Sequence, residues 1–413
     1  MSMTSTNLGH GGDVAITDQR HEGGPVWLSA MAGLCASLVG LGLARFAYTP
    51  LIPALISAKW FSPAEAVYLG AANLAGYLAG ALIARELGSR AGSVRALRAM
   101  MVLASLTAFA CAVPISFIWF FGWRFLAGLS GGVIMVLAAS TILPHVAPNK
   151  RGFVGGVIFA GVGLGVAASG TLVPLLLQHG VRASWYGLGV LSVLLTLVSW
   201  KAWPADHAAP ERTLDNAVSA QAKPRAVVRA LKIEYGLNAL ALVPHMVFLV
   251  DFVARGLGQG ILSGSHYWVI YGIGATLGPL LTGHLADHTG FGPALRVAFV
   301  IEAIAILLPA LNSGPAALIL SSLVVGGFTP GIVPLVLGRI HELLPHDPNG
   351  QRAAWAQATT TFAVFQAAAA YGLSYLFEHS GSDYAILFVI GAGAVIISLA
   401  IDLVTALTLR RRR

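Results

Sequence analysis

The sequence predicts an all-α polytopic membrane protein, and three observations lead to this fold class. Hydrophobic residues fill 56% of the 413 positions and charged residues only 10%, whereas a soluble domain carries about 25% charged residues. The mean hydropathy of +0.77 agrees with this balance. The apolar residues also gather into twelve runs, each of roughly 20 residues or more, which is the length that a helix needs to cross a bilayer.

Composition also excludes several other classes of protein. Two cysteines cannot form a disulfide scaffold, and the high apolar content differs from that of a disordered or collagen-like chain. A net charge of +8 would suggest nucleic-acid binding in a soluble protein. In a membrane protein the basic residues instead orient the chain, so we expect the lipid bilayer as a partner and no nucleic acid.

The twelve transmembrane helices can be assigned in chain order from the apolar runs. They are expected at residues 26–56, 62–87, 96–118, 119–145, 152–177, 183–203, 234–258, 263–286, 291–311, 315–340, 352–378 and 383–409. The preceding 25 residues are polar and lack the basic start, short apolar core and cleavage site of a signal peptide. The first apolar run is too long for such a peptide, so we expect it to be a retained helix.

A polar stretch at residues 204–231 divides the twelve helices into two sets of six. Leu143-Pro144-His145 recurs 201 positions later as Leu344-Pro345-His346, and each copy is followed by Pro-Asn and then an arginine. Duplication of a six-helix unit explains this repeat. The expected organisation is a polar tail (1–25), a first bundle (26–203), a linker (204–231), a second, pseudo-symmetric bundle (232–409) and a basic tail (410–413).

The distribution of basic residues predicts that both termini face the cytoplasm. With that orientation, 20 of the 25 Lys and Arg residues lie in cytoplasmic segments and three face the opposite side. The remaining two, Arg45 and Arg124, lie inside predicted helices. An excess of this kind follows the positive-inside rule, and it brings the basic residues to the anionic inner leaflet.

Three segments resemble the major facilitator superfamily of transporters. Residues 283–290 read GHLADHTG and match the G-x-L-a-D-x-x-G loop of that superfamily between helices eight and nine. Residues 123–132 (WRFLAGLSGG) resemble its R-F-x-x-G-x-x-x-G pattern, and residues 42–53 (GLARFAYTPLIP) are similar to the first helix of the YbfB/YjiJ-like group of bacterial carriers. The resemblance spans the whole chain. It implies the major facilitator fold, the bacterial inner membrane, and alternating access to a site between two bundles.

Charged residues inside the predicted helices are the first candidates for that site. Arg45 carries a charge that costs roughly 2.5–3.5 kcal/mol to insert, and it lies too far from both helix ends to reach the surface. Asp251 lies at nearly the corresponding depth in helix seven. We predict that the two face each other across a central cavity, where Arg45 binds an anionic substrate and Asp251 takes up the coupling proton. The alternatives are a fixed ion pair, or Asp251 near the outer surface with Arg255.

Polar and aromatic residues of other helices complete the predicted substrate site. Its members are Arg45, Tyr48, Asn73, Tyr77, Arg124, His245, His266 and Tyr267. A gate or interfacial role competes for Arg124, and a lone histidine in an apolar helix is more often structural. Gln357 and Gln366 are nine positions apart in one helix, so at most one should face the cavity. Glu302 and Asp402 are expected to be protonated or packed outside it.

The cytoplasmic helix ends supply the predicted inner gate. Its expected members are Gly283, Asp287, Gly290, Arg151 and Arg352, with the carboxylate of Asp287 docked on the N-terminus of a neighbouring helix. The sequence contains no Walker loop, nucleotide-binding fingerprint, H-E-x-x-H or paired-cysteine metal motif. We therefore expect no enzyme activity, no cofactor and no metal.

These features predict a monomeric secondary active transporter that moves a small organic anion together with protons. The alternative within the superfamily is an efflux carrier for drugs or metabolites. A non-transporting receptor or a membrane-embedded transferase is a more remote alternative. The chain offers no long soluble loop for signalling and no acid–base cluster at a membrane face.

Overall fold

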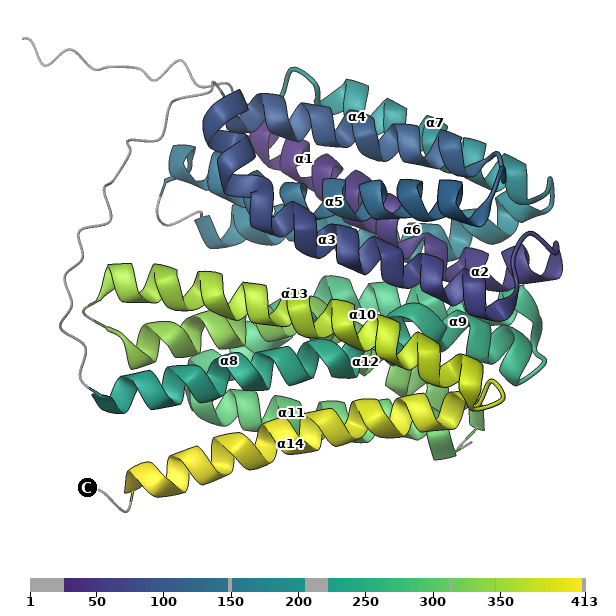
Figure 1. Ribbon diagram of the computed structural model, residues 1–413. Helices are drawn as coiled ribbons and strands as arrows, with labels where there is room; N and C mark the ends of the chain where they lie inside the picture. Colours follow the sequence, from purple (N-terminus) through teal and green to yellow (C-terminus); the bar gives the residue numbers. More distant parts are fainter. Residues whose placement is uncertain (1–25, 148–150, 205–221, 312–313, 346, 411–413) are drawn as a thin grey trace, which may run out of the picture.

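The computed structural model describes residues 26–147, 151–204, 222–311, 314–345 and 347–410, which form long helices with short connections. The helices of the two halves of the chain form two bundles that lie side by side with their axes roughly aligned (Figure 1). Helix α1 (Val26–Ser37) begins and α14 (Tyr384–Arg410) ends at one end of the molecule, named here the terminal face. The opposite end is named the far face.

The first bundle contains six membrane-length segments. The first runs continuously from Val26 to Ser57 through α1, the π-helical segment η1 (Leu38–Phe46) and α2 (Tyr48–Ser57). The others are α3 (Pro63–Ala91), α4 (Ser93–Cys111), α5 (Phe117–Ile142) with the 3-10 turn η2 (Leu143–His145), α6 (Arg151–Leu177) and α7 (Val181–Ser199).

The second bundle follows the same plan. Its first segment combines α8 (Ala222–Val243), the π-helical η4 (Pro244–Phe248), α9 (Leu249–Asp251) and the π-helical η5 (Phe252–Gly256). Next come α10 (Gly260–Thr289), α11 (Phe291–Leu307) with the 3-10 turn η6 (Leu308–Leu311), α12 (Gly314–Leu343), α13 (Pro348–His379) and α14. Among the described residues, eleven segments are apolar and long enough to span a membrane. The twelfth expected span, α13, has 32 residues but a more polar sequence.

Local features recur at matching places in the two halves. The segments that begin the two bundles both contain π-helical turns, which bring an extra residue into the turn and are frequent at functional sites. Gly92 (φ 86°) joins α3 to α4, and Gly290 (φ 81°) joins α10 to α11. A side chain disfavours this left-handed region, so glycine at both positions permits the tight connection. The recurrence agrees with a duplicated unit.

Glycines set the distance between paired helices inside each bundle. In the first, a Cβ added to Gly76 would lie 1.9 Å from the Phe125 carbonyl oxygen, and one added to Gly128 would lie 1.8 Å from that of Asn73. In the second, a Cβ at Gly278 would lie 1.9 Å from the Gly327 oxygen. The α3–α5 and α10–α12 pairs therefore pack backbone against backbone, as small residues permit in membrane helices.

Candidate functional site

Arg45 lies at the boundary between the bundles, within the π-helical segment η1. Its Nη2 donates a hydrogen bond of 2.8 Å to Oε1 of Gln366, which belongs to α13 of the other bundle. The guanidinium carbon lies 4.8 Å from the Tyr77 ring centroid and 5.0 Å from that of Phe46. The side chain is 9% exposed. A buried charge therefore joins the bundles through the neutral amide of Gln366, while two aromatic rings of its own bundle pack against the guanidinium.

Arg124 occupies a second buried position a short way along the same interface. Its Nη1 donates to the carbonyl oxygen of Ala44 at 2.8 Å, and its guanidinium carbon lies 4.1 Å from the Tyr48 ring centroid. Nδ2 of Asn73 donates to the backbone oxygen of Arg124 at 3.2 Å, and the Tyr48 hydroxyl donates to the Ala66 oxygen at 2.7 Å. The close α3–α5 contact thus brings Asn73 and Arg124 together.

Neither buried arginine contacts a carboxylate among the described residues. The ion pairs of this part of the chain belong to Arg90, Arg255, Arg296 and Arg339. The Nε atoms of Arg45 and Arg124 are buried without a hydrogen-bond partner. Two positive charges are consequently enclosed in apolar surroundings without a counter-charge from the described residues. This arrangement is costly unless a bound group provides the negative charge.

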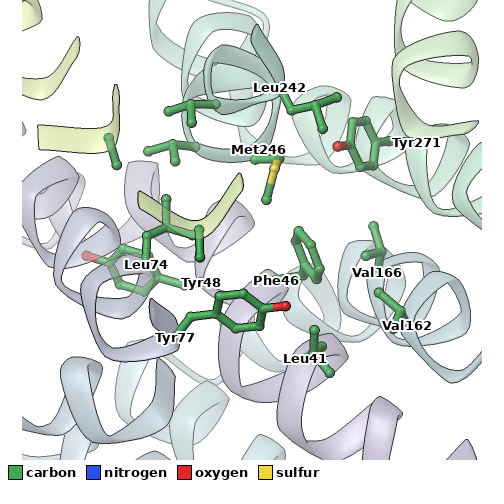
Figure 2. Packing of buried hydrophobic residues seen from close by; sticks show 14 of the residues in the cluster. Leu41, Phe46, Tyr48, Leu74, Tyr77, Val162, Val166, Leu242, Met246 and Tyr271 are labelled. Carbon is green, nitrogen blue, oxygen red and sulfur yellow. The ribbon is translucent and has the colours of Figure 1, made fainter. Parts of the chain in front are cut away.

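A small cavity connects these groups. It measures about 20 Å³, which is room for about one water molecule. Its lining comprises Arg45, Phe46, Tyr48, Thr49, Ile52, Gly70, Asn73, Leu74, Arg124, Met246 and Val247, drawn from both bundles. Figure 2 shows Phe46 and Tyr77 of the first bundle across the interface from Met246 and Tyr271 of the second. The conformation described is therefore closed around the site.

The bundles contact each other closely from mid-membrane to the far face. Besides the Arg45–Gln366 bond, Thr49 Oγ1 donates to the Met246 oxygen at 2.6 Å. Trp268 Nε1 of α10 also donates to Ser169 Oγ of α6 at 3.1 Å. Toward the terminal face, by contrast, a Cβ added to Gly155 or Gly156 of α6, or to Gly283 of α10, would have no atom within 4 Å. The far side is the tightly packed one.

The structure contradicts the predicted pairing of Arg45 with Asp251. The Asp251 carboxylate is fully buried and forms a bidentate ion pair with Arg255, one turn further along the same segment. It also accepts a hydrogen bond of 2.6 Å from the Tyr384 hydroxyl of α14. The alternative in which Asp251 pairs with Arg255 toward the far face is the correct one. The prediction from depth along the helix fails because the side chain points away from the cavity.

The histidines expected in the substrate site lie elsewhere. His245 is fully buried inside the second bundle, where Nε2 lies 2.8 Å from Ser321 Oγ and the ring packs edge-on against Phe388. His266 is exposed at the far end of α10. Tyr267 is buried there but does not line the cavity. These three residues therefore do not line the cavity in the conformation described.

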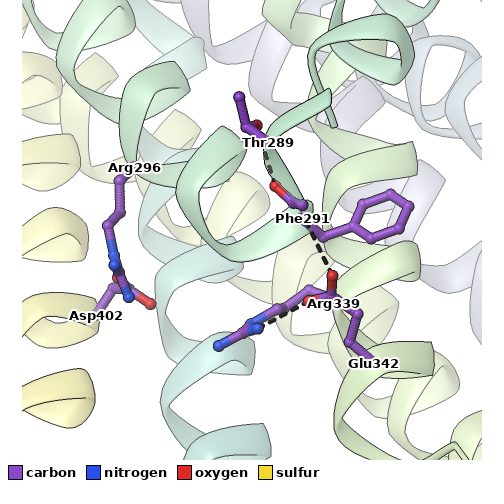
Figure 3. Close-up of polar contacts among 7 residues, drawn as sticks. Thr289, Phe291, Arg296, Arg339, Glu342 and Asp402 are labelled. Atoms are coloured by element: carbon purple, nitrogen blue, oxygen red, sulfur yellow. Dashed lines mark hydrogen bonds and ion pairs between the residues drawn. The ribbon is translucent and has the colours of Figure 1, made fainter. Parts of the chain in front are cut away.

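The predicted gate motif is helical rather than a loop. Residues 283–289 form the last turns of α10, and Gly290 caps the helix in the left-handed region. Asp287 is exposed and does not dock on α11. Oε1 of Glu342, at the end of α12, accepts a hydrogen bond of 3.1 Å from the Phe291 amide that begins α11, and Oε2 accepts from Arg339 (Figure 3). The side chains of Arg151 and Arg352 lie outside the described residues.

Several interface residues are missing from the predicted site. Gln366 is buried against Arg45 whereas Gln357 is exposed, so only Gln366 of the two contacts a candidate site residue. Thr49, Met246, Ser169 and Tyr271 give no signal in the sequence, because an apolar or hydroxyl residue in a transmembrane helix is ordinarily a packing residue. The bonds of Thr49 and Ser169 across the interface depend on the angle between bundles, which no local pattern encodes.

Comparison with known proteins agrees with this geometry. A protein family described as uncharacterised MFS-type transporter YbfB matches residues 37–403. The chain belongs to this family. It is thus a membrane transport protein of the major facilitator type, and the resemblance noted in its first helix is confirmed. No curated protein sequence matches the chain.

Solved structures of other major facilitator proteins share the fold of this MFS-type transporter. A crystal structure of a single-residue mutant of the nucleoside transporter NupG superposes with a TM-score of 0.71 at 14% identity, covering 91% of this chain and 99% of that one. A partially occluded inward open form of the xylose transporter XylE from E. coli gives 0.70 at 12% identity, covering 91% and 96%. A D-xylose-proton symporter gives 0.70 at 15% identity with the same coverage.

Proposed function

We propose that this MFS-type transporter is a secondary active carrier that moves a small organic anion across the bacterial inner membrane by alternating access, coupled to protons. The observation that supports the anion is the pair of buried guanidiniums, Arg45 and Arg124, without a carboxylate contact in the described part of the chain. A negatively charged solute can provide the counter-charge that the protein lacks.

In the proposed site, Arg45 exchanges the amide of Gln366 for an anionic group of the solute. Arg124 provides a second positive charge, Tyr48 and Asn73 line the cavity, and the Tyr77 ring packs against the Arg45 guanidinium. The present volume of about 20 Å³ admits no organic solute. Binding therefore requires the bundles to separate at the Arg45–Gln366 contact, which is the motion expected of alternating access.

We further propose that the terminal face is cytoplasmic, because the sequence assigns 20 of its 25 Lys and Arg residues to the side of the two termini. The closed far face then corresponds to the outer side of the membrane, and the described conformation is inward-facing. Gly283, Asp287 and Gly290 lie at the terminal face and, with Arg151 and Arg352, are the proposed inner gate. In the described conformation Asp287 is free to meet a partner when this face closes.

The second candidate is an efflux carrier for amphipathic or aromatic compounds. It is favoured by the rings that gather at the interface, where Phe46 lies 6.1 Å from Trp268 and Trp268 stacks on Tyr271 at 4.8 Å. The nucleosides and xylose named for the structural neighbours do not transfer to this chain at 12–15% identity. A neutral solute would also leave both guanidiniums uncompensated, and we therefore favour the anion.

A ligand screen by thermal unfolding tests the proposal. Purified protein is heated with mono- and dicarboxylates and, separately, with neutral aromatic compounds. A ligand present at 100 times its Kd stabilises the folded state by about 2.7 kcal/mol. We expect carboxylates to raise the Tm of the native protein and of Arg90→Ala, whose side chain is on the surface. Arg45→Ala should lose the rise. A rise that survives in Arg45→Ala, or one produced only by neutral compounds, would contradict the anion proposal.

A further inference from the structure

Glu302 is a fully buried carboxyl group at mid-membrane depth in the second bundle. It lies in α11, eleven positions after Phe291 begins the helix and nine before Leu311 ends the segment. Helix α11 packs against α10, α12 and α14. A carboxyl group at this depth is out of reach of bulk water from either face. Its charge state therefore depends on its immediate neighbours.

The only polar neighbour bonded to Glu302 in the described residues is a neutral amide. Nδ2 of Asn238 lies 2.6 Å from Oε2 of Glu302, while Oε1 of Glu302 and Oδ1 of Asn238 are both buried without partners. A separation of 2.6 Å is short for N–H···O but typical of O–H···O. Amide oxygen and nitrogen are interchangeable in position. The geometry fits a protonated carboxyl group that donates to the amide oxygen.

The groups that face Glu302 provide no counter-ion. Asn238 of α8 is the group bonded to it. Other buried titratable groups on the surrounding elements include Glu234 of α8, His245 of η4, which bonds Ser321 of α12, Tyr271 of α10 and Asp402 of α14. Asp402 is ion-paired with Arg296 (Figure 3). Glu234 lies in α8 one turn nearer the terminal face than Asn238. No basic side chain bonds to Glu302 in the described part of the chain. Asp251, by contrast, is neutralised by Arg255.

Tyr271 links this carboxyl group to the substrate cavity. Its helix, α10, packs against α11, which carries Glu302, and its side chain lies across the interface from Phe46 (Figure 2). Its ring stacks on Trp268, which is bonded to Ser169 of the first bundle. A movement of the bundles that breaks the Trp268–Ser169 bond would therefore change the surroundings of Tyr271, and with them the polarity around Glu302.

We propose that Glu302, held by Asn238, is the site that binds the coupling proton. This inference rests on the proposed proton-coupled carrier and assigns the proton to a different residue from Asp251. In the described conformation the carboxyl group is protonated. When the bundles rock and water reaches the Tyr271 side, Glu302 releases the proton to that water, and the anion site of the first bundle then experiences the new negative charge.

Infrared spectroscopy tests the proton site without knowledge of the substrate. The purified protein in lipid is titrated from acid to alkaline pH, and the carbonyl band of protonated carboxyl groups is followed. We expect a band at neutral pH that is absent in Glu302→Gln and unchanged in Asp251→Asn. Glu302→Gln should fold, because glutamine matches a protonated glutamate in shape. Glu302→Asp retains a carboxyl group, so it should shift the band rather than remove it. A band that disappears in Asp251→Asn instead would overturn the assignment.

Transport in proteoliposomes tests the coupling, with the anion that gives the largest thermal shift as the probe. We expect Glu302→Gln to abolish accumulation driven by a pH gradient while it retains exchange of labelled for unlabelled anion. Asp251→Asn should retain both activities. Gradient-driven accumulation at the native level in Glu302→Gln would refute the inference. If no anion is bound or transported by the native protein, the proposed function fails, while the infrared result still decides whether Glu302 holds a proton.

Discussion

Replacing Gly163 with alanine should shift the protein toward a form that is open at the far face. Gly163 lies in α6 where that helix meets α10 of the other bundle. An added Cβ would lie 2.3 Å from Thr276 Oγ1, 2.7 Å from the Thr276 amide nitrogen and 3.0 Å from the Ala275 carbonyl carbon. Ordinary contacts of this kind begin near 3.4 Å. Because two of the three atoms are backbone, rotation of the Thr276 side chain cannot relieve the overlap, and the helices must separate.

The magnitude follows from the cost of overpacking. An extra methyl group in a tightly packed contact costs roughly 1–3 kcal/mol, and this cost applies only to the form in which α6 and α10 touch. A difference of that size changes the ratio of two conformations by about 5- to 150-fold. Alanine also favours a helix over glycine by up to about 1 kcal/mol, but this gain is common to both conformations. Gly155→Ala, two turns away in α6 with no atom within 4 Å, provides the matched control.

Cysteine labelling measures the shift. Thr49 is 3% exposed and lies on the far side of the cavity, so Thr49→Cys serves as the reporter. The native Cys35 and Cys111, both buried, are replaced by alanine. A membrane-impermeant maleimide added to intact cells should label the introduced thiol faster in Gly163→Ala than in Gly155→Ala. The labelling rate reaches its maximum once the form open at the far face predominates. Equal rates in the two variants would refute the idea that the α6–α10 contact holds the far face closed.

Three further predictions concern stability and follow from single contacts. Tyr384→Phe removes the hydrogen bond to the buried Asp251 carboxylate and should lower the free energy of unfolding by roughly 1.5–3 kcal/mol, measured by denaturation in detergent. Gly76→Ala places a Cβ 1.9 Å from a backbone oxygen of α5, so it should abolish the monodisperse peak in size-exclusion chromatography, while Gly122→Ala, with no neighbour within 4 Å, keeps it. Glu342→Gln should lower the free energy of unfolding by only about 0.3–1 kcal/mol, because its contact with the start of α11 is exposed. A larger loss in the same denaturation experiment would contradict this prediction.

The fold could be predicted from sequence because membranes impose one strong rule. Backbone groups inside the bilayer must bond within their own helix, so the length of an apolar run fixes the element. The same rule explains why α13 is the membrane-spanning helix that is hardest to assign from its sequence. Helix α13 carries Gln366, the partner of Arg45, and it is missing from the eleven apolar segments found among the described residues; it packs against α3 of the other bundle. A polar residue in such a helix is the expected mark of an internal surface.

The site could be predicted in part because a charge inside a helix is conspicuous. This signal marks Arg45 and Arg124, and the structure places Tyr48, Asn73 and Tyr77 in contact with one or the other. The partner of each charge could not be predicted. Whether an acid faces the cavity or its own helix depends on rotation about the helix axis, and the π-helical turns that flank Asp251 alter that rotation locally.

The neutral partner of Arg45 suits a carrier better than the acid that was expected there. Had Asp251 paired with Arg45, an incoming anion would have to displace a carboxylate and leave it buried, which carries a high desolvation cost. Gln366 offers only one hydrogen bond of 2.8 Å, and the amide remains neutral when the bond breaks. In the proposed mechanism, the buried arginines of the first bundle bind the anion, and Glu302 of the second, which bonds no cation among the described residues, binds the proton. Because the two groups lie in different bundles, the relative motion of the bundles can couple the two events. Gln366→Glu should therefore abolish anion binding as thoroughly as Arg45→Ala, although the substituted side chain has nearly the same size.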